Sequence, residues 1–378
     1  MKRTQQRVVP VAERSLPTPP RHRSPRQRPT KRFYRETEAV AARRPRTWRT
    51  LIVLLVLLAA AAVTLLLAGC GRSEPAAVNP GGPKLTKVIL QTDWFAEPEH
   101  GGFYQALVKG YYREAGLDVE IRQGNPSTHP QQVVATGQAD FAVGRSDDVS
   151  TYVARGVPVV FVGAYMQRDP QAIVFHEESG IKTFRDLDGR NIMAVPGSAF
   201  ITLMEKTFHI SVAVTPSDYG MSRFLADKKF IQQCFITNEP YYLRQQGAKI
   251  GVLPLWEIGY SPYRVWYAQR SFVNAHPDIV KAFCAATLRG WRDYADGDHT
   301  AADARIGELN TKMTPDFVKF SADAMKQYQL ITGDPKAGQA LGQIDPARIA
   351  RELQQLVDIG QLDHPLKIDD VFDPRFLP

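Results

Sequence analysis

The chain has 378 residues, of which 44% are hydrophobic and 23% are charged, and its formal net charge is +8 at pH 7. Residues 1–69 hold 15 of the 47 Lys and Arg residues but 3 of the 39 Asp and Glu residues. Residues 70–378 therefore carry 32 basic and 36 acidic residues, a net charge of −4, so the composition does not favour nucleic-acid binding. The three cysteines are too few and too far apart for a disulfide framework or a cysteine-rich metal site, and Cys234 and Cys284 are expected to be buried free thiols.

The sequence of the N-terminal region predicts a targeting segment and not a folded domain. Residues 1–50 are rich in Arg and Pro and predict a disordered basic leader. Residues 51–70 are an apolar segment that ends in Leu-Ala-Gly-Cys, which resembles a bacterial lipoprotein signal with Cys70 as the lipidated residue. The alternative is an uncleaved signal-anchor helix. Residues 71–84 contain Pro, Gly and Ser and predict a tether that holds the folded part at an extracytoplasmic membrane surface.

A βαβ unit opens the folded part of the chain. Residues 87–90 (KVIL) predict a buried strand, and a polar loop follows. Phe103 and later apolar residues recur at helical spacing until Gly116, after which residues 117–121 alternate as a second strand. Ligands bind beyond the carboxyl ends of strands in open α/β sheets, so the loop over residues 93–102 is the expected ligand position.

The same alternation of strands and helices continues toward residue 270 and then gives way to helices. It predicts an α/β fold in which parallel-rich sheets carry helices on both faces. Further strands are predicted at residues 140–143, 158–164, 172–175, 191–195, 232–236, 252–255 and 264–268. The later helices are predicted to start at Pro277 and to cover residues 314–329 and 346–359.

Several segments of the chain together resemble a solute-binding protein of an ABC importer. The resemblance is to the group of sulfonate-binding and thiamine-pyrimidine-precursor-binding proteins. It is carried by residues 93–121, GQADFAVG at 137–144, residues 155–175, FRDLDGRNIMAVPGS at 184–198, FITNEP at 235–240 and residues 274–291. The resemblance implies a monomeric, type II periplasmic-binding-protein-like fold of two α/β lobes that clamp a small molecule and deliver it to an ABC permease and ATPase. The first lobe would comprise residues 85–170 and 263–378, and the second lobe residues 171–262.

Four residues in the first polar loop are candidate ligand contacts. Trp94 presents a flat aromatic face, Asp93 and Glu97 present carboxylate acceptors, and His100 is a donor or an acceptor. Trp94 could instead cover the lobe core, and His100 could be only a helix-start residue.

The other candidates also follow predicted strands. Arg145 and Ser146 stand at a helix start, where backbone N–H groups favour a polar or anionic ligand group. From the second lobe we expect contributions from Ser198, at another helix start, and from Asn238, Glu239 and Tyr241. Capping is an alternative role for Ser198, and Glu239 could be a hinge or surface residue.

Three classes of function are consistent with this pattern. The first is ligand capture for import, with no cofactor, and the second is a thiamine-pyrimidine synthase, which the same resemblance includes. Such synthases have a cysteine-rich iron-binding run and a Lys/His pair in the helix after the third strand, whereas residues 144–155 contain neither Lys nor His. The third is a membrane-anchored sensor, for which the sequence has no signalling domain. Trp94, Asp93 and His100 favour a flat heteroaromatic ligand, such as a pyrimidine thiamine precursor or a flavin. Sulfonates or other organic anions are the alternative, through Arg145.

Overall fold

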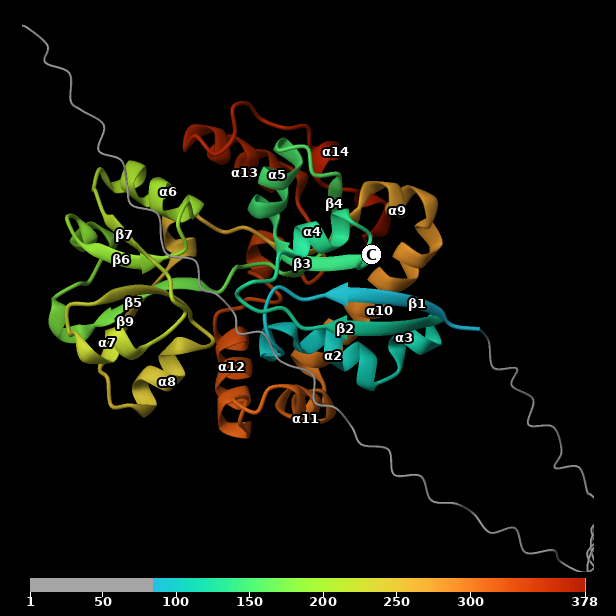
Figure 1. Cartoon of the computed structure of the whole chain (residues 1–378), viewed down its shortest axis with the longest axis horizontal. Helices are drawn as coiled ribbons and strands as arrows, with labels where there is room; N and C mark the ends of the chain where they lie inside the picture. Colours follow the sequence, from blue (N-terminus) through green and yellow to red (C-terminus); the bar gives the residue numbers. More distant parts are fainter. Residues whose placement is uncertain (1–83, 378) are drawn as a thin grey trace, which may run out of the picture. The chain divides into compact units, whose positions relative to one another are not determined.

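A computed structural model describes residues 84–377, and these residues belong to one compact unit. The leader, the apolar segment, Cys70 and nearly all of the tether lie outside the described residues, so the predictions made for them stay predictions. Two five-stranded sheets organise the described part, and α-helices flank them (Figure 1). Within residues 84–377, no helix is both long enough and apolar enough to span a bilayer.

The first sheet has the strand order β2-β1-β3-β10-β4. Its strands are β1 (Thr86–Gln91), β2 (Leu117–Arg122), β3 (Phe141–Arg145), β4 (Val159–Met166) and β10 (Arg264–Gln269). β1 pairs in parallel with β2 and β3, whereas β10 runs antiparallel between β3 and β4. Four of the five strands therefore point the same way, and β10 starts at the edge where the others end.

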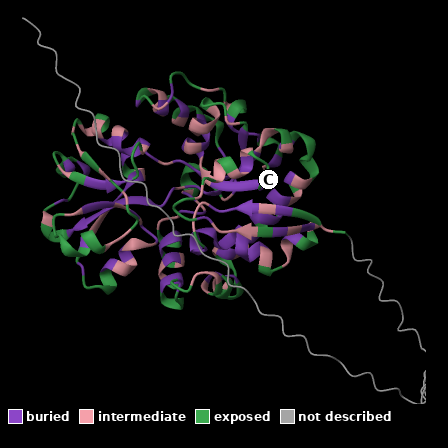
Figure 2. Cartoon of the chain, in the orientation of Figure 1, coloured by how far each residue is buried: buried purple, intermediate pink, exposed green. Residues whose placement is uncertain are grey.

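Alternation along the strands explains why helices cover both faces of this sheet. Phe141 and Val143 of β3 belong to one apolar core, and Ala142 between them belongs to another. Successive side chains of a strand point to opposite faces, so β3 must be apolar on both sides. Helices α2 (Gly101–Val108) and α10 (Pro277–Asp296) pack on one side, and α4 (Pro130–Ala135) and α5 (Ser146–Ala154) on the other. Figure 2 shows the resulting concentration of buried residues along the strands.

The second sheet repeats this plan with the order β7-β6-β8-β5-β9. Its strands are β5 (Gln171–His176), β6 (Asn191–Ala194), β7 (Ala213–Pro216), β8 (Ile231–Phe235) and β9 (Ile250–Pro254). β6 is parallel to β7 and β8, and β5 is antiparallel to β8 and β9. Its nearby helices are α6 (Ala199–Phe208), α7 (Ser222–Ala226) and α8 (Glu239–Gln245).

The chain passes from one sheet to the other twice, through residues 167–170 and residues 255–263. After β10 the chain is mostly helical. Helix α9 (Arg270–Ala275) precedes α10, and α10 is followed by α11 (Thr300–Leu309), α12 (Pro315–Gln327), α13 (Pro346–Asp358) and α14 (Ile368–Val371). These crossings separate the two sheets. The predicted division into lobes at residues 170 and 262 remains a proposal, because the described chain is one compact unit.

The predicted fold class is confirmed, and the differences are local. β5 and β10 are antiparallel to their neighbours, although the alternation of strands and helices had indicated parallel pairing. The helix expected from Phe103 to Gly116 is divided into α2 and α3 (Tyr111–Glu114) at Gly110, whose φ of 77° lies in the left-handed region that glycine adopts without strain. Cys234 and Cys284 are free and buried, as predicted.

Candidate ligand site

Charged residues from four strands meet at one edge of the first sheet. Asp93 follows β1, Arg145 ends β3 and Asp169 follows β4, all at carboxyl ends of strands that point the same way. Arg264 is the first residue of antiparallel β10 and pairs in register with Arg145, so it reaches the same edge from the opposite direction. This is the edge at which α/β sheets bind ligands.

Asp93 is the best-connected carboxylate of this edge. Its Oδ2 accepts a hydrogen bond of 2.6 Å from Arg264 Nη2, and its Oδ1 lies 3.0 Å from His100 Nε2. Burial alone would raise the pKa of Asp93, but the charge of Arg264 and the hydrogen bonds from His100 and Arg264 together lower it. Asp93 is therefore ionised at neutral pH, and its side chain remains 27% exposed for a further contact.

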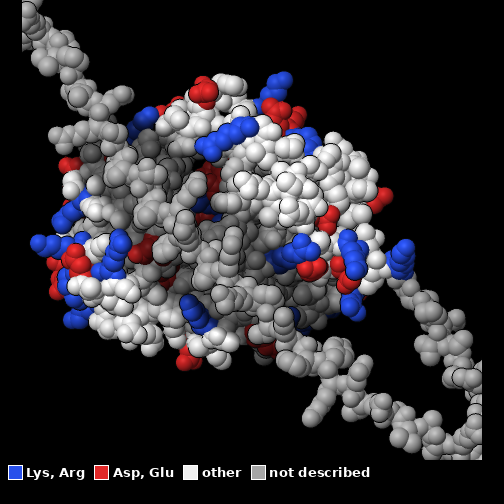
Figure 3. Space-filling view, in the orientation of Figure 1, with Lys and Arg blue, Asp and Glu red and all other residues white. Residues whose placement is uncertain are grey.

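Both arginines of the edge are already paired with carboxylates. Arg145 donates from Nε to Asp147 (3.0 Å) and from Nη2 to Asp148 (2.7 Å). Arg264 donates to Asp93, and its Nη1 lies 3.8 Å from Asp169 Oδ2. Because each guanidinium has carboxylate partners, the edge does not present an uncompensated positive charge. Acidic and basic side chains are also interspersed over the face shown in Figure 3.

Two glutamates link the first sheet's loop to the second sheet. Glu99, in the 3₁₀ turn η1 (Pro98–His100), accepts a hydrogen bond from the hydroxyl of Thr237, which follows β8. Glu97 accepts from Asn238 Nδ2 at 3.3 Å. Burial raises the pKa of Glu99 to about 7, and burial together with the charges of Glu99 and Asp93 raises that of Glu97. These contacts join the two halves of the site through carboxyls that readily hold a proton.

Glu239 adds a third carboxyl to this junction from the start of α8. Its Oε2 accepts a hydrogen bond from the backbone N–H of Phe235, so it caps the turn between β8 and α8. Burial raises its pKa to about 7.

Aromatic rings form the outer part of the site. Trp94 lies 5.6 Å from Phe95 and 5.1 Å from Tyr219, measured between ring centroids. Tyr219 lies in the loop after β7, so the Trp94–Tyr219 contact also joins the two sheets' loops. Tyr219 is 53% exposed and has a φ of 57°, a left-handed conformation that is uncommon for a non-glycine residue and often marks functional loops.

The remaining predicted contacts lie apart from this centre. Ser146 is fully buried, donates to Glu352 Oε2 (2.7 Å) and accepts from the backbone N–H of Tyr263. Ser198 precedes α6 without a side-chain capping bond and donates instead to the carbonyl of Val195 at 2.7 Å. Tyr241 packs against Phe317 and Phe320 of α12. The structure thus brings together Asp93, Trp94, Glu97, His100, Asn238 and Glu239, with Arg145 farther along the same edge.

Sequence reasoning missed four residues of the site, namely Glu99, Asp169, Tyr219 and Arg264. The sequence predicts Arg264 at the start of a strand. A residue at that position reaches the ligand-binding edge only if its strand runs antiparallel to the neighbouring strands. Asp169 stands in a crossing segment, a position that could have indicated it. Tyr219 follows a strand that the sequence analysis did not predict. Among residues 84–377 no cluster of three or more His, Cys, Asp or Glu side chains has the arrangement of a metal site.

Comparisons with a family model and with known proteins show what this chain is similar to. Residues 97–301 match the family described as NMT1/THI5 like. A riboflavin-binding protein of Chloroflexus aurantiacus is 23% identical over 84% of this chain and 95% of its own length. A 4-amino-5-hydroxymethyl-2-methylpyrimidine phosphate synthase of Candida albicans is 30% identical over 61% of this chain and 73% of its own length.

A further relative and a solved structure extend the comparison. A formylaminopyrimidine-binding protein of Halalkalibacterium halodurans is 25% identical over 55% of this chain and 66% of its own length. The solved alkanesulfonate-binding protein SsuA of Xanthomonas axonopodis pv. citri has a TM-score of 0.59 at 12% identity and covers 78% of this chain and 100% of its own. That likeness identifies the fold. The match over residues 97–301, more than half of the chain, shows that this protein belongs to the NMT1/THI5-like family.

Proposed function

We propose that the protein is the solute-binding component of an ABC importer and captures a small ligand outside the cytoplasm. The observation that carries this proposal is the meeting of both sheets' loops in the contacts Glu99–Thr237, Glu97–Asn238 and Trp94–Tyr219. A ligand held between such loops contacts both halves and stabilises their closed arrangement. The names of the riboflavin-binding and formylaminopyrimidine-binding relatives support binding as the activity.

The chemistry of the site favours a flat heteroaromatic ligand that donates hydrogen bonds, such as a pyrimidine thiamine precursor. Trp94 and Tyr219 supply aromatic faces, and Asp93 supplies an ionised acceptor. An amino-substituted ring could stack on the aromatic faces and donate N–H hydrogen bonds to Asp93. The match over 95% of a riboflavin-binding protein supports the flavin alternative.

The organic-anion alternative has less support from the same geometry. It depended on Arg145 as an available cation, but Arg145 donates to both Asp147 and Asp148. An anion would have to displace one of these carboxylates and would lie close to the ionised Asp93. The like charge of Asp93 disfavours an additional anion.

A synthase activity is also less well supported, although some relatives carry that name. The helix after the third strand is α5, and residues 144–155, which include it, contain neither Lys nor His. The two cysteines within the described residues are buried, and burial raises the pKa of the Cys284 thiol to about 12. They are therefore unsuited to act as thiolate ligands.

Anchoring at Cys70 is part of the proposal and has its own test. If residues 51–70 are a lipoprotein signal, Cys70→Ala should leave an unprocessed precursor and abolish fatty-acid labelling of the mature protein. Metabolic labelling with a radioactive fatty acid measures this, with Cys234→Ala as the matched control. Unchanged labelling of the Cys70 variant would contradict the anchor.

Titration of a Trp94 variant tests the proposed ligand class. A central stacking residue contributes about 2–4 kcal/mol to binding, so Trp94→Ala should weaken the binding of formylaminopyrimidine or riboflavin from about 30-fold to several hundred-fold. Trp94→Phe should recover much of that loss, because it keeps an aromatic face. Calorimetry on both variants measures the affinities, and thermal unfolding without ligand reports any loss of stability.

Phe95→Ala is the matched control, because Phe95 is a neighbouring aromatic residue that is 43% exposed. It should change the affinity less than Trp94→Ala does. A Trp94→Ala protein that melts well below the wild type yet binds within about twofold would make Trp94 a structural residue and would place the ligand elsewhere. Mass spectrometry of the ligand released from protein purified without refolding would identify the natural ligand.

A further inference from the structure

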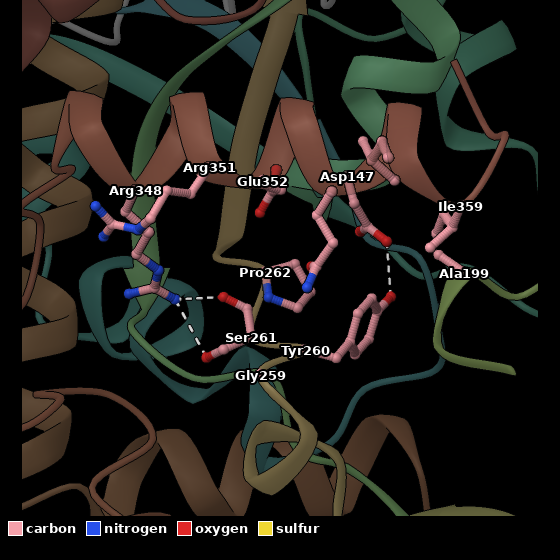
Figure 4. Close-up of a pocket in the computed structure, with 12 residues that line it drawn as sticks. Asp147, Ala199, Gly259, Tyr260, Ser261, Pro262, Arg348, Arg351, Glu352 and Ile359 are labelled. Atoms are coloured by element: carbon pink, nitrogen blue, oxygen red, sulfur yellow. Dashed lines mark hydrogen bonds between the residues drawn. The ribbon is translucent and has the colours of Figure 1, made fainter. Parts of the chain in front are cut away.

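A pocket lies beside the crossing segments, and Trp94 is not among the residues that line it. It has a volume of about 210 Å³ and is bounded by α13, by residues 259–262 of the second crossing and by the first residue of α6, Ala199 (Figure 4). This volume corresponds to roughly seven water molecules at ~30 Å³ each. The pocket therefore has room for a compact molecule.

Arg348 of α13 forms one wall and holds both crossing segments. Its Nη2 donates to the carbonyl oxygen of Gln167 (2.6 Å) in the first crossing and to that of Ser261 (2.5 Å) in the second. Its guanidinium carbon lies 3.7 Å from the ring centroid of Tyr263. Nη1 of the same guanidinium is buried without a hydrogen-bond partner among the described residues. A cationic N–H group of a residue that lines the pocket thus lacks a protein partner in this part of the chain.

Glu352 lies one helical turn beyond Arg348 and also lines the pocket. Its Oε2 accepts a hydrogen bond from Ser146, whereas Oε1 is buried without a partner among the described residues. Burial, together with the charge of Asp147, raises the pKa of Glu352 to about 8, despite the opposing charges of Arg348 and Arg145. At neutral pH the side chain is mostly the neutral acid, and an O–H on Oε1 is a second donor for the pocket.

The other charges around the pocket are compensated or cationic. Asp147 accepts hydrogen bonds from Arg145 (3.0 Å) and from the hydroxyl of Tyr260 (2.6 Å), the latter drawn in Figure 4. Arg351 lines the pocket with a side chain that is 70% exposed, and its Nη2 lies 3.6 Å from Asp345. Helix α6 contributes Ala199 to the pocket lining, and Leu356 and Ile359 supply apolar surface.

We propose that this pocket binds a small organic monocarboxylate, held by Arg348 Nη1 and the Glu352 carboxyl, with its apolar part against Leu356 and Ile359. A carboxylate has two acceptor oxygens and so satisfies two neighbouring donors, one of them charged. A dianion such as sulfate suits the pocket less well, because Leu356 and Ile359 make part of its lining apolar and Asp147 also lines it. Since Arg348 also holds both crossings, the bound carboxylate would sit against the hinge of the protein.

The experiment uses the full chain, with sodium butyrate as the probe and butyramide as its neutral isostere. Calorimetry measures the affinities, and the carbon-13 NMR signal of the labelled carboxylate reports binding of butyrate. Butyrate should bind to the wild type at least tenfold more tightly than butyramide at pH 7. Its affinity should fall as the pH rises above about 8, because an ionised Glu352 loses its donor and repels the anion. Arg348→Gln should weaken butyrate binding at least tenfold.

Glu352→Gln supplies the sharper test, because the amide keeps a donor and cannot ionise. This variant should still bind butyrate, with an affinity that no longer falls between pH 7 and pH 9.5. It also keeps the proposal falsifiable if Arg348→Gln fails to fold. Arg305→Gln, which breaks an exposed ion pair with Glu308 on α11, is the matched control and should bind as the wild type does.

Other outcomes would overturn the proposal. Equal binding of butyrate and butyramide would show that the carboxylate is not recognised. Binding that is lost in Trp94→Ala would locate the probe in the proposed ligand site, and displacement of butyrate by equimolar sulfate would indicate an unspecific anion site. An unchanged pH profile in Glu352→Gln would remove Glu352 from the site. None of these results depends on whether the importer function holds.

Discussion

Glu99 illustrates how a single residue links burial, charge and the joining of two loops. It is 1% exposed, its Oε1 accepts a hydrogen bond from Thr237, and its Oε2 is buried without a partner among the described residues. An ionised carboxylate in that position would lack solvation at one oxygen, so burial raises its pKa to about 7. The neutral acid is therefore favoured in the folded state.

Replacing Glu99 by Gln should flatten the dependence of stability on pH. In the unfolded chain Glu99 loses its proton near pH 4.5, whereas in the folded protein it does so near pH 7. Between these values the folded state binds more protons, so the wild type loses stability as the pH rises, and no further loss from this group occurs above about pH 7. Glu99→Gln lacks this loss, and its free energy of unfolding should exceed that of the wild type at pH 8 by about 3 kcal/mol.

Urea unfolding of both proteins at pH 4.5, 6 and 8 measures this difference. The two free energies of unfolding should be similar at the lowest pH, where the carboxyl is protonated in the folded protein and still half protonated in the unfolded chain. Glu308→Gln, on an exposed ion pair of α11, is the control and should leave the profile unchanged. Parallel pH profiles for Glu99→Gln and the wild type would show that Glu99 is ionised without penalty in the folded protein.

At the scale of elements, the close approach of α2 and α10 depends on glycines. A Cβ on Gly102 would lie 2.1 Å from the ring of Trp291, and one on Gly290 would lie 2.4 Å from the carbonyl oxygen of Gly102 and 2.6 Å from Ala106 Cβ. The rings of Trp291 and Tyr294 lie against α2 because the Gly101–Gly102 pair leaves room for them. A Gly-Gly pair that in sequence looked like a loop feature is thus the start of a packed helix.

Gly290→Ala should therefore destabilise the protein although alanine is the better helix former. The gain in helix propensity is about 1 kcal/mol, and overpacking against a backbone oxygen costs about 1–3 kcal/mol, so the net loss of stability should reach up to about 2 kcal/mol. Gly307→Ala on α11 is the matched control, because its nearest new contact is 3.3 Å away. Denaturant unfolding compares the two, and a Gly290 variant as stable as the Gly307 variant would contradict the close packing.

Elements with strong periodicity could be predicted from the sequence, and the others depend on distant contacts. β4 is buried along its whole length and was recognisable as a continuous apolar run. β7 has mostly exposed residues and pairs with β6 only at the sheet's edge, so its sequence carries little signal. The antiparallel direction of β5 and β10 follows from the crossings between sheets, and no local pattern encodes it.

The same distinction applies to the site when the whole molecule is considered. Asp93, Trp94 and His100 could be predicted because they share one loop after one strand. The partners that complete the site, Arg264 and Tyr219, are more than 100 residues away in sequence and meet that loop only through the fold. A single sequence does not show which residues of such distant segments lie beside each other. Candidate site residues can therefore be predicted only from the residue types at the ends of strands.

A clamp built on these long-range contacts should respond to both ligand and pH. Ligand bound between Asp93, Trp94 and the second sheet's loops would favour the arrangement in which Glu99 meets Thr237 and Glu97 meets Asn238. Those carboxyls have raised pKa values in the arrangement that contains these contacts, so protonation should favour it and ionisation should oppose it. The distance between the two halves should therefore shorten with ligand at pH 8, and shorten in part without ligand at pH 5.

Electron–electron resonance between spin labels can measure this distance. Arg113→Cys on α3 and Glu177→Cys after β5 place exposed labels on the two halves, in a Cys70→Ala background whose other cysteines are buried. The mean distance should decrease with saturating formylaminopyrimidine or riboflavin, and the ligand-free distribution should move toward the same value at pH 5. Glu99→Gln should weaken the pH response while it leaves the ligand response in place. Identical distributions with and without a ligand that calorimetry shows to be bound would mean that the site is preformed and that the two halves do not act as a clamp.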